Sequence, residues 1–357
     1  MSETRRVKIS FATLMKRSWP VIALAGFLIF VLAALTIAII INTHPFQKKS
    51  GPDGKDIVVP TTTARELVPR MLDGVQVPFE EAALQPFAVM VENSPDAWPL
   101  VGLAKANLVI EAPVEGNITR FLAVFDATTT VDQIGPVRSA RPYFVDFANG
   151  LQAVYAHVGG SPEALSLIHV LSSFRNLDEF SSGKYFWRSS KRAMPHNTYT
   201  RIDLLRSAAE DKDWLTAPFR PWRYASSSES GDVRELTVPY PGVFSVRWSY
   251  NSSTGQYQRF QAKSEQKDAD GASVKAANVV IFYSESQVLD DLGRLRIRTT
   301  GTGKAKLYRN GTQKEIVWRR RSGEWISFEA VDGSTVEFAP GTTWIEVVTT
   351  SAKNGSL

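Results

Sequence analysis

The residues of this chain that are best placed to do chemistry lie in four polar, glycine- or proline-containing segments, each next to an expected strand or helix end. These segments are Glu111–Arg120 (EAPVEGNITR), Ile134–Arg141 (IGPVRSAR), Ala156–Pro162 (AHVGGSP) and Trp187–Tyr199 (WRSSKRAMPHNTY). The loops at such ends are where layered α/β domains gather their ligand-binding residues. We therefore expect a functional site to be built from these four segments.

The segment Val158–Ser161 has the pattern of a strand, a glycine turn and a helix start. Its glycines would let backbone N–H groups turn toward a ligand, and the N-terminus of a helix favours an anion. Arg138 and Arg141 could hold a carboxylate or phosphate through paired hydrogen bonds, and a histidine could exchange a proton near neutral pH. The predicted ligand-binding residues are Arg138, Arg141, His157, Gly159, Gly160, Arg188, His196 and Asn197.

A structural role is the alternative for these same residues. Two glycines before a helix N-cap also form an ordinary tight turn. The arginines could equally pair inside the domain with Glu111, Glu115 or Asp146. The sequence leaves the anion pocket and the internal pairing both open.

A catalytic site is a second alternative. A hydrolase would combine Ser139 or Ser161, His157 or His196, and Asp126 or Asp146. The chain has no G-x-S-x-G motif, and Ser161 is better explained as an N-cap. Glu111 and Glu115 could act as acid and base on a glycan, but their spacing does not fix their separation.

Metal and cofactor sites have no support in the sequence. His157, His169 and His196 are not arranged as H-E-x-x-H or in a similar ligand spacing, and the chain contains no cysteine. We therefore predict no metal and no cofactor. The absence of cysteine also excludes disulfides and thiol catalysis.

The elements expected to position the candidate site alternate between strands and helices. Buried strands are expected at Phe87–Glu92, Leu108–Glu111, Arg120–Phe125 and Ala153–Val158, which are rich in Val, Leu and Phe. Helices are expected over Ser139–Asn149, from Ser161 with Pro162 at the first helical position, and from Thr200. This alternation predicts an α/β layered domain at 86–223.

The pattern changes after a serine-rich boundary at 224–235. Expected strands follow at Val243–Tyr250, Gln256–Ala262, Val279–Ser284, Leu295–Thr300, Lys304–Arg309, Glu315–Arg320, Trp325–Ala330 and Thr343–Val348. Asn310-Gly311 and Asp332-Gly333 are two-residue hairpin signals between such runs. A mostly antiparallel β domain is therefore predicted at 236–350. Its many aromatic residues are expected in the core more than on a glycan-binding face.

The N-terminal region predicts a membrane anchor. Residues 21–41 contain no charged side chain, and 21 residues of helix span about 31 Å, enough for a bilayer core of about 30 Å. Residues 1–20 carry five basic residues and one acidic residue, so we expect this segment to be cytoplasmic. Residues 42–85 read as a linker. The run lacks a signal-peptidase pattern, so cleavage is not expected.

The net charge does not indicate a nucleic-acid partner. The chain has 41 basic and 36 acidic residues, and removal of residues 1–20 leaves 36 basic and 35 acidic ones. The basic character is thus largely a property of the N-terminal segment and not of a recognition face. We predict no nucleic-acid binding.

Several strings of the chain resemble a known family. FAVMVEN, GLAKANLVIEAPVEGNITRFLAVF, IGPVRSARPYFVDFANGLQAVYAHVGGSPEAL and FWRSSKRAMPHNTYT, followed by VRWSYNSSTGQYQRF and PGTTWIEVV, are similar to the YerB-like bacterial envelope family, domain of unknown function 3048. The resemblance covers roughly residues 80–350. It implies a membrane-tethered, extracytoplasmic protein of two domains, and it assigns no reaction.

These observations together predict an α+β protein with an N-terminal transmembrane helix, an α/β layered domain and a mostly antiparallel β domain. We expect a non-enzymatic binding or scaffolding protein of the cell envelope. Its expected partners are the cytoplasmic membrane, through residues 21–41, and an anionic or peptidoglycan-related ligand or a protein of wall assembly. An envelope hydrolase or transferase that acts on wall polymer is the alternative.

Overall fold

The computed structural model describes residues 48–50, 56–58, 66–214, 216, 219–226 and 230–352. The chain divides into two compact units, Met1–Arg65 and Glu66–Leu357. In the first unit, β1 (Lys48–Ser50) and β2 (Asp56–Val58) pair antiparallel. The predicted membrane span, 21–41, and the predicted cytoplasmic segment before it lie outside the described residues. No helix within the described ranges is long and apolar enough to cross a bilayer.

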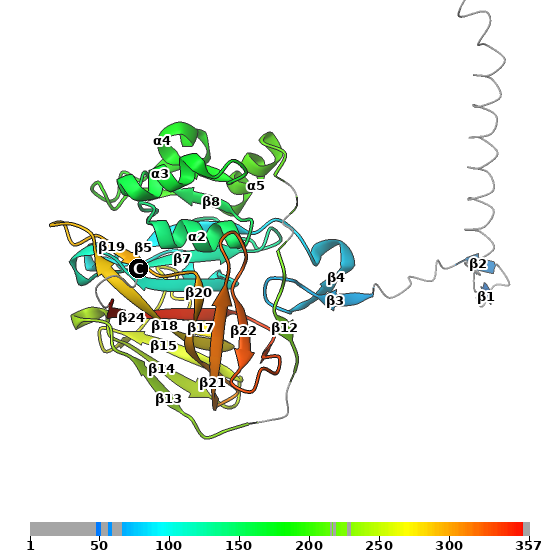
Figure 1. The fold of residues 1–357 in the computed structure, drawn as a ribbon. Helices are drawn as coiled ribbons and strands as arrows, with labels where there is room; N and C mark the ends of the chain where they lie inside the picture. The colour runs from blue at the N-terminus through cyan, green and yellow to red at the C-terminus, as the bar shows by residue number, and fades with distance from the viewer. Residues whose placement is uncertain are drawn as a thin grey trace, which may run out of the picture. The chain divides into compact units, whose positions relative to one another are not determined.

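A sheet of 11 strands forms the centre of the unit Glu66–Leu357 (Figure 1). Its order is β22-β21-β20-β18-β24-β6-β7-β5-β8-β9, with β19 paired to β18. The strands are β5 (Phe87–Glu92), β6 (Leu108–Pro113), β7 (Thr119–Phe125), β8 (Val154–His157), β9 (Asn176–Asp178), β18 (Asn278–Val288), β19 (Leu295–Ile297), β20 (Gly301–Arg309), β21 (Thr312–Arg320), β22 (Ser327–Ala330) and β24 (Thr343–Ser351). The last strand, β24, lies between β18 and β6 and is parallel to both, so early and late segments of the chain share one sheet.

A second, antiparallel sheet covers one face of the large sheet. It contains β13 (Glu235–Val238), β14 (Val246–Asn251), β15 (Gln256–Gln261), β16 (Ser264–Glu265) and β17 (Lys275–Ala276). Figure 1 shows β13, β14 and β15 side by side. Trp248 of this sheet packs edge-to-face on Trp344 of β24, which packs in the same way on Phe121 of β7. These rings form the centre of the core between the two sheets.

Four α-helices accompany the two sheets within the described residues. They are α2 (Pro142–Gly150), α3 (Pro162–Val170), α4 (Glu179–Ser182) and α5 (Ile202–Asp211). Helix α2 buries Phe144 and Phe147 on the face opposite the small sheet. Helix α3 begins as predicted, because Ser161 Oγ accepts a hydrogen bond from the N–H of Ala164 at 3.2 Å and Pro162 occupies the first turn.

Short elements complete the described residues. The short strands are β3 (Leu67–Pro69), β4 (Gln76–Pro78), β10 (Trp187–Arg188), β11 (Thr198–Tyr199), β12 (Arg223–Tyr224) and β23 (Glu337–Phe338), and the 3-10 helices are Phe79–Glu81, Pro95–Ala97, Leu103–Lys105, Glu115–Asn117, Gly183–Tyr185 and Gly242–Phe244. The short strands pair in twos, β3 with β4, β10 with β11 and β12 with β23.

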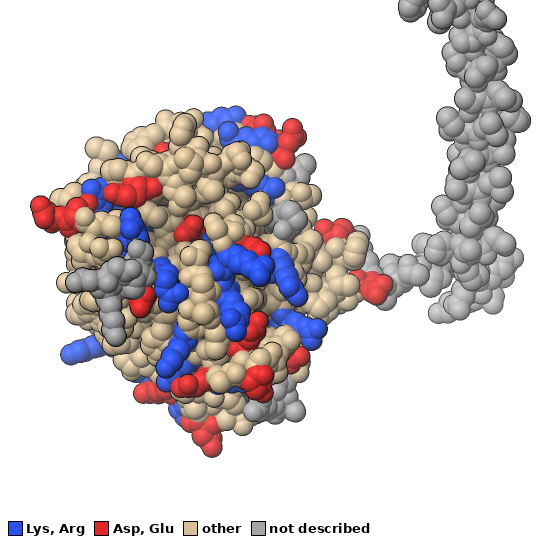
Figure 2. Space-filling model, viewed as in Figure 1, with Lys and Arg blue, Asp and Glu red and all other residues tan. Residues whose placement is uncertain are grey.

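Basic and acidic side chains lie together on the surface of β20, β21 and β22. Figure 2 shows Lys and Arg side chains over these strands with Asp and Glu side chains among them. Arg319 Nε lies 2.7 Å from Glu329 Oε2, and Lys306 Nζ lies 3.7 Å from Glu315 Oε1. Both pairs join neighbouring strands, so they compensate charge across the sheet.

The predicted fold class was wrong. We expected α+β overall, with an N-terminal transmembrane helix, an α/β layered domain and a mostly antiparallel β domain. The described residues are instead mostly β with few helices. The predicted transmembrane helix lies outside these residues. The physical reason is the placement of β24: its parallel pairing with β6 and β18 extends the strands of the expected α/β layer into one long mixed sheet.

Candidate functional site

The carboxyl ends of six strands lie along one edge of the large sheet. β9, β8 and β5 are parallel neighbours, and β6, β24 and β18 form a second parallel set. The antiparallel strand β7 joins the sets, so β5 and β6 run in the same direction. In open sheets with parallel strands, ligands bind in the crevice outside the carboxyl ends. We call this edge the carboxyl edge.

On one face of the carboxyl edge, three arginines meet two glutamates. Arg120 lies at the start of β7, and Arg138 and Arg141 lie in the loop before α2. Arg138 Nε is 3.1 Å from Glu92 Oε1. Arg141 Nε donates to Glu115 Oε2 at 2.9 Å, and its Nη2 contacts the other oxygen of the same carboxylate. We call these five residues the arginine cluster.

Arg120 lacks a carboxylate of its own. Its side chain is buried, with the residue 6% exposed, and its Nη1 donates to the backbone oxygen of Ser139 at 2.8 Å. The carboxylate oxygen within ion-pair range is Glu115 Oε1, at 4.0 Å, and Arg141 already contacts that oxygen. Burial, reinforced by the charge of Arg141, lowers the pKa of Arg120 to about 10. The cluster therefore carries more positive than negative charge.

Two of the predicted site residues meet at Glu92. His196 Nδ1 lies 2.9 Å from Glu92 Oε2, while Arg138 contacts the other oxygen of this carboxylate. Arg138 Nη1 also lies 3.4 Å from the backbone oxygen of Pro195, next to His196. The loop that contains His196 is thereby attached to the arginine cluster. Arg141 binds a different carboxylate and is part of the same cluster.

Three further predicted residues hold the loop between β8 and α3. His157 is fully buried, its Nδ1 lies 2.7 Å from the backbone oxygen of Gly159, and its Nε2 lies 2.6 Å from Asn176 Oδ1. Gly159 has a φ of 56°, and its N–H donates to Asp178 Oδ1 at 2.9 Å. A Cβ on Gly160 would lie 3.1 Å from the methyl of Ala140. These contacts give the three residues a structural explanation.

The remaining predicted residues, Arg188 and Asn197, lie next to each other. Arg188 Nη1 is 3.4 Å from Asn197 Oδ1. The guanidinium of Arg188 also binds Glu179 in a bidentate pair, at 3.1 and 3.0 Å. The charge of Arg188 is thus compensated by a carboxylate of the same chain.

On the opposite face of the large sheet, β6 and β24 hold a buried pair of acids. Glu111 of β6 and Glu346 of β24 are register partners, and both are fully buried. Arg259 of β15 contacts Glu111 directly, and its Nε lies 3.8 Å from Glu346 Oε1. Trp248 Nε1 donates to Glu346 Oε1 at 2.8 Å. Burial and the neighbouring Glu111 carboxylate raise the pKa of Glu346 well above its usual value.

A polar network leads from the acid pair toward the surface. Thr119 Oγ1 donates to Glu111 Oε1 at 2.6 Å, and Asn93 Nδ2 donates to Thr119 Oγ1 at 2.7 Å. Asn93 also exchanges amide hydrogen bonds with Gln261, at 3.2 and 3.3 Å. Trp98 Nε1 donates to Asn93 Oδ1 at 2.9 Å. The network ends at a cavity of about 310 Å³ that Trp98 and Gln261 help to line.

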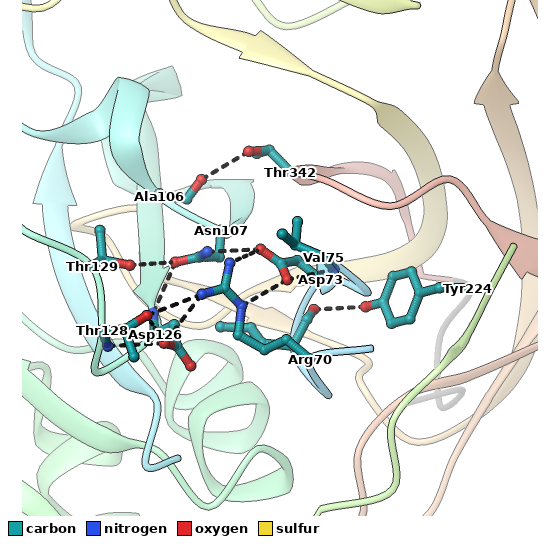
Figure 3. Close-up of polar contacts among 11 residues, drawn as sticks. Arg70, Asp73, Val75, Ala106, Asn107, Asp126, Thr128, Thr129, Tyr224 and Thr342 are labelled. Carbon is teal, nitrogen blue, oxygen red and sulfur yellow. Dashed lines mark hydrogen bonds and ion pairs between the residues drawn. The ribbon is translucent and has the colours of Figure 1, made fainter. Parts of the chain in front are cut away.

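A separate network, at the other edge of the large sheet, has a structural role (Figure 3). Arg70 binds Asp73 through two hydrogen bonds of 2.9 and 2.7 Å, and its Nη1 lies 3.3 Å from Asp126 Oδ1. Asn107 Nδ2 donates to Asp73 Oδ2 at 2.8 Å, and the hydroxyl of Tyr224 donates to the oxygen of Leu72 at 2.6 Å. The network joins the segment before β4 to the amino end of β6 and to β12.

The geometry does not bring together the two histidines and two glutamates that the sequence offered for catalysis. His157 contacts Asn176, His196 contacts Glu92, Glu111 contacts Arg259, and Glu115 contacts Arg141. A nucleophile or acid must lie within about 3 Å of its base or reacting atom, and these four side chains are committed to separate partners. Within the described ranges, no three His, Asp or Glu side chains are grouped as metal ligands.

Sequence reasoning missed Arg120, Trp98 and Arg259. Arg120 is the last residue of the segment EAPVEGNITR, and its place directly before an apolar run was the available signal. Arg259 lies in the alternating strand QYQRFQ, where period two puts it on the buried side. No signal in the sequence brings Trp98 next to Gln261, because the two are far apart along the chain.

Comparisons with known proteins place the chain in a family. A family model described as protein of unknown function (DUF3048), N-terminal domain, matches residues 72–215, and the model of the corresponding C-terminal domain matches residues 236–345. The chain therefore belongs to the DUF3048 family, and the resemblance seen in the sequence is confirmed.

The chain is also similar to a curated protein and to a solved structure. The chain is 34% identical over 298 residues to the "Putative lipoprotein YerB" of Bacillus subtilis (strain 168), which covers 81% of this chain and 88% of that protein. It also matches the crystal structure of the YerB protein from Bacillus subtilis, with a TM-score of 0.71 and 32% identity over 78% of this chain and 95% of that one.

Proposed function

We propose that this protein is a non-enzymatic binding protein of the bacterial cell envelope, and that the arginine cluster holds an anionic group of a wall polymer. The observation that carries the proposal is that three guanidinium groups share only two carboxylates at the carboxyl edge, which leaves one positive charge in excess. A carboxylate or a phosphate is the ligand group that a guanidinium fork recognises best.

Arg120 is the arginine of the cluster whose charge is least compensated. A buried charge is costly unless it is paired and hydrogen-bonded. Arg120 has one hydrogen bond, to a neutral carbonyl, and shares a carboxylate 4.0 Å away with Arg141. An anion that bound Arg120 from the loop side would supply the missing charge. The lowered pKa of Arg120 is the electrostatic sign of the same deficit.

The proposed location rests on the relative from Bacillus subtilis. That protein is described as a lipoprotein, and lipoproteins are attached to a membrane through their lipid. The chain shares most of its length with this relative, so we propose that it also works at the membrane, on the extracytoplasmic side. This chain contains no cysteine that could carry a lipid.

A binding role accounts for the geometry better than the alternative of a wall hydrolase or transferase. The histidines and glutamates considered for catalysis are held by separate partners, as described above. The arginine cluster needs no reactive group to act. It needs only an anion of matching geometry.

The test is cosedimentation of the purified full-length protein with cell-wall sacculi, before and after their anionic polymers are removed. The wild-type protein should sediment with untreated walls, and free phosphate should compete with the walls. Arg120→Met should weaken binding by about tenfold or more, because a charge-assisted hydrogen bond and its ion pair are lost. Arg120→Lys, which keeps the charge without the fork, should bind at an intermediate level.

Arg319→Met is the matched control, because Arg319 is an exposed arginine whose partner is Glu329 on the neighbouring strand. It should bind walls as the wild-type protein does. Thermal unfolding of each variant establishes that it is folded. The proposal fails if the wild-type protein does not sediment with walls, or if a folded Arg120→Met variant binds them as tightly as wild type.

A further inference from the structure

We propose that the cavity beside Trp98 is a saccharide site that takes a short, neutral stretch of glycan. The cavity has a volume of about 310 Å³, which is at the lower end of the range for small-molecule sites. Its walls come from both halves of the chain. They are Trp98, Pro99 and Leu100 on one side, and Gln261, Ala262, Ser264, Glu265, Gln266 and Lys267 on the other.

Trp98 provides a fixed aromatic wall. Its Nε1 donates to Asn93 Oδ1 at 2.9 Å, and its ring meets Phe244 edge-to-face at 6.3 Å. The indole is partly exposed and lines the cavity. The C–H face of a sugar ring is apolar and carries small positive partial charges, so it packs well on the negative face of an aromatic ring. A ring that is already held in place loses little entropy on binding.

Side-chain amides and a hydroxyl provide the polar wall. Gln266 Oε1 accepts a hydrogen bond from Arg259, which orients the amide and leaves its NH₂ group available for a ligand. The hydroxyl of Ser264 lies on the short exposed strand β16. Gln261 is nearly buried and bound to Asn93, so it forms the polar floor. Such groups fix the orientation of sugar hydroxyls.

The charges at the rim favour a neutral ligand. Glu265 and Lys267 are the charged residues that line the cavity, and their side chains form an ion pair of 3.3 Å. The hydroxyl of Ser273 also donates to Glu265. The rim therefore has no net charge, in contrast to the arginine cluster. The two sites differ in the chemistry they accept and lie on opposite faces of the carboxyl edge.

The cavity is held open by contacts behind both walls. Arg192 donates to the backbone oxygens of Ala97 and Pro99 at 2.5 and 2.9 Å. Asp268 Oδ2 accepts from the N–H of Ala104 at 2.9 Å, and the N–H of Ala269 donates to the oxygen of Leu100 at 2.8 Å. These bonds fasten the segment after β16 to the segment around Leu100. The walls thus keep their distance without a ligand.

Isothermal titration calorimetry of the full-length protein with chitooligosaccharides tests the inference. The wild-type protein should show saturable binding. Trp98→Leu keeps an apolar side chain but removes the aromatic face. Ser264→Trp fills the cavity from an exposed position on β16. Each change should weaken binding by about tenfold or more.

The matched control is Ser252→Trp, which places the same side chain on the exposed turn between β14 and β15. This variant and Arg120→Met should both bind the oligosaccharides as wild type does, so the saccharide site and the anion site can fail separately. The inference is overturned if the wild-type protein shows no binding, or if Ser264→Trp binds as tightly as Ser252→Trp.

Discussion

Glu111 and Glu346 should lose very different amounts of stability on the same isosteric substitution. They are register partners on neighbouring parallel strands, and both are fully buried. Arg259 is in direct contact with Glu111, whereas its Nε lies 3.8 Å from Glu346. The raised pKa of Glu346 means that this carboxyl holds its proton in the folded protein to a higher pH than in the unfolded chain.

Glu111→Gln removes the carboxylate that pairs with Arg259. A buried guanidinium is then left without its contact partner, and the loss of one member of a buried ion pair costs about 3–5 kcal/mol. Glu346→Gln replaces a carboxyl that burial and the neighbouring Glu111 favour in its neutral form by an amide of the same shape. The amide oxygen can still accept from Trp248 Nε1, so the free energy of unfolding at neutral pH should fall by about 1 kcal/mol or less.

The pH dependence gives a second signature. A group whose pKa is raised by folding stabilises the folded state fully below its unfolded pKa, and this contribution is lost as pH rises through the folded pKa. Wild type should therefore lose stability relative to Glu346→Gln as pH rises from about 4 upward. Urea unfolding at several pH values measures both effects. The reasoning is refuted if Glu346→Gln costs as much as Glu111→Gln at pH 7, or if the gap between wild type and Glu346→Gln does not change with pH.

Three further predictions concern the scaffold of the site. Burial raises the pKa of Asp268 from 3.8 to about 6, and each pKa unit corresponds to about 1.4 kcal/mol, so wild type should lose up to about 3 kcal/mol of stability between pH 4 and pH 7. In urea unfolding, Asp268→Asn should remove this dependence on pH. A wild-type stability that does not change with pH would contradict the prediction. Gly159→Ala should lower the free energy of unfolding by about 1–2 kcal/mol, because the φ of 56° at this position disfavours a residue with a Cβ. The new Cβ would also touch the ring of Phe180, but that ring is exposed and can move. An unchanged melting temperature would contradict the prediction. Arg70→Met leaves Asp73 and Asp126 without the arginine that pairs with both. The free energy of unfolding, measured by chemical denaturation, should fall by about 3 kcal/mol. A fall of less than about 1 kcal/mol would show that the network contributes little to stability.

Local features of the fold were readable from the sequence because they depend on neighbours along the chain. The start of α3 follows from the hydroxyl of Ser161 and the ring of Pro162, which act within one helical turn. The fully buried Trp248, Trp318 and Trp344 confirm that aromatic residues of the second half belong to the core. These predictions needed no knowledge of the tertiary fold.

The order of the strands in the large sheet could not be predicted from the sequence, because it depends on pairing between segments that are distant along the chain. Thr343–Val348 has the pattern of a strand, but the sequence does not say that it will insert between β6 and β18. The same limit applies to the candidate site. In the sequence, Arg259 is a charged residue at a buried strand position with no visible partner. The large sheet supplies its partners, Glu111 and Glu346, which are distant along the chain.

The central claim, that the arginine cluster binds an anion, is tested most directly by thermal unfolding of the full-length protein in increasing inorganic phosphate at constant ionic strength. A ligand that binds only the folded state stabilises it by about 2.7 kcal/mol when its concentration is 100 times Kd. The account predicts that the melting temperature of wild type and of Arg319→Met rises with phosphate, while that of Arg120→Met does not. Equal rises in all three proteins, or no rise in wild type, would contradict it.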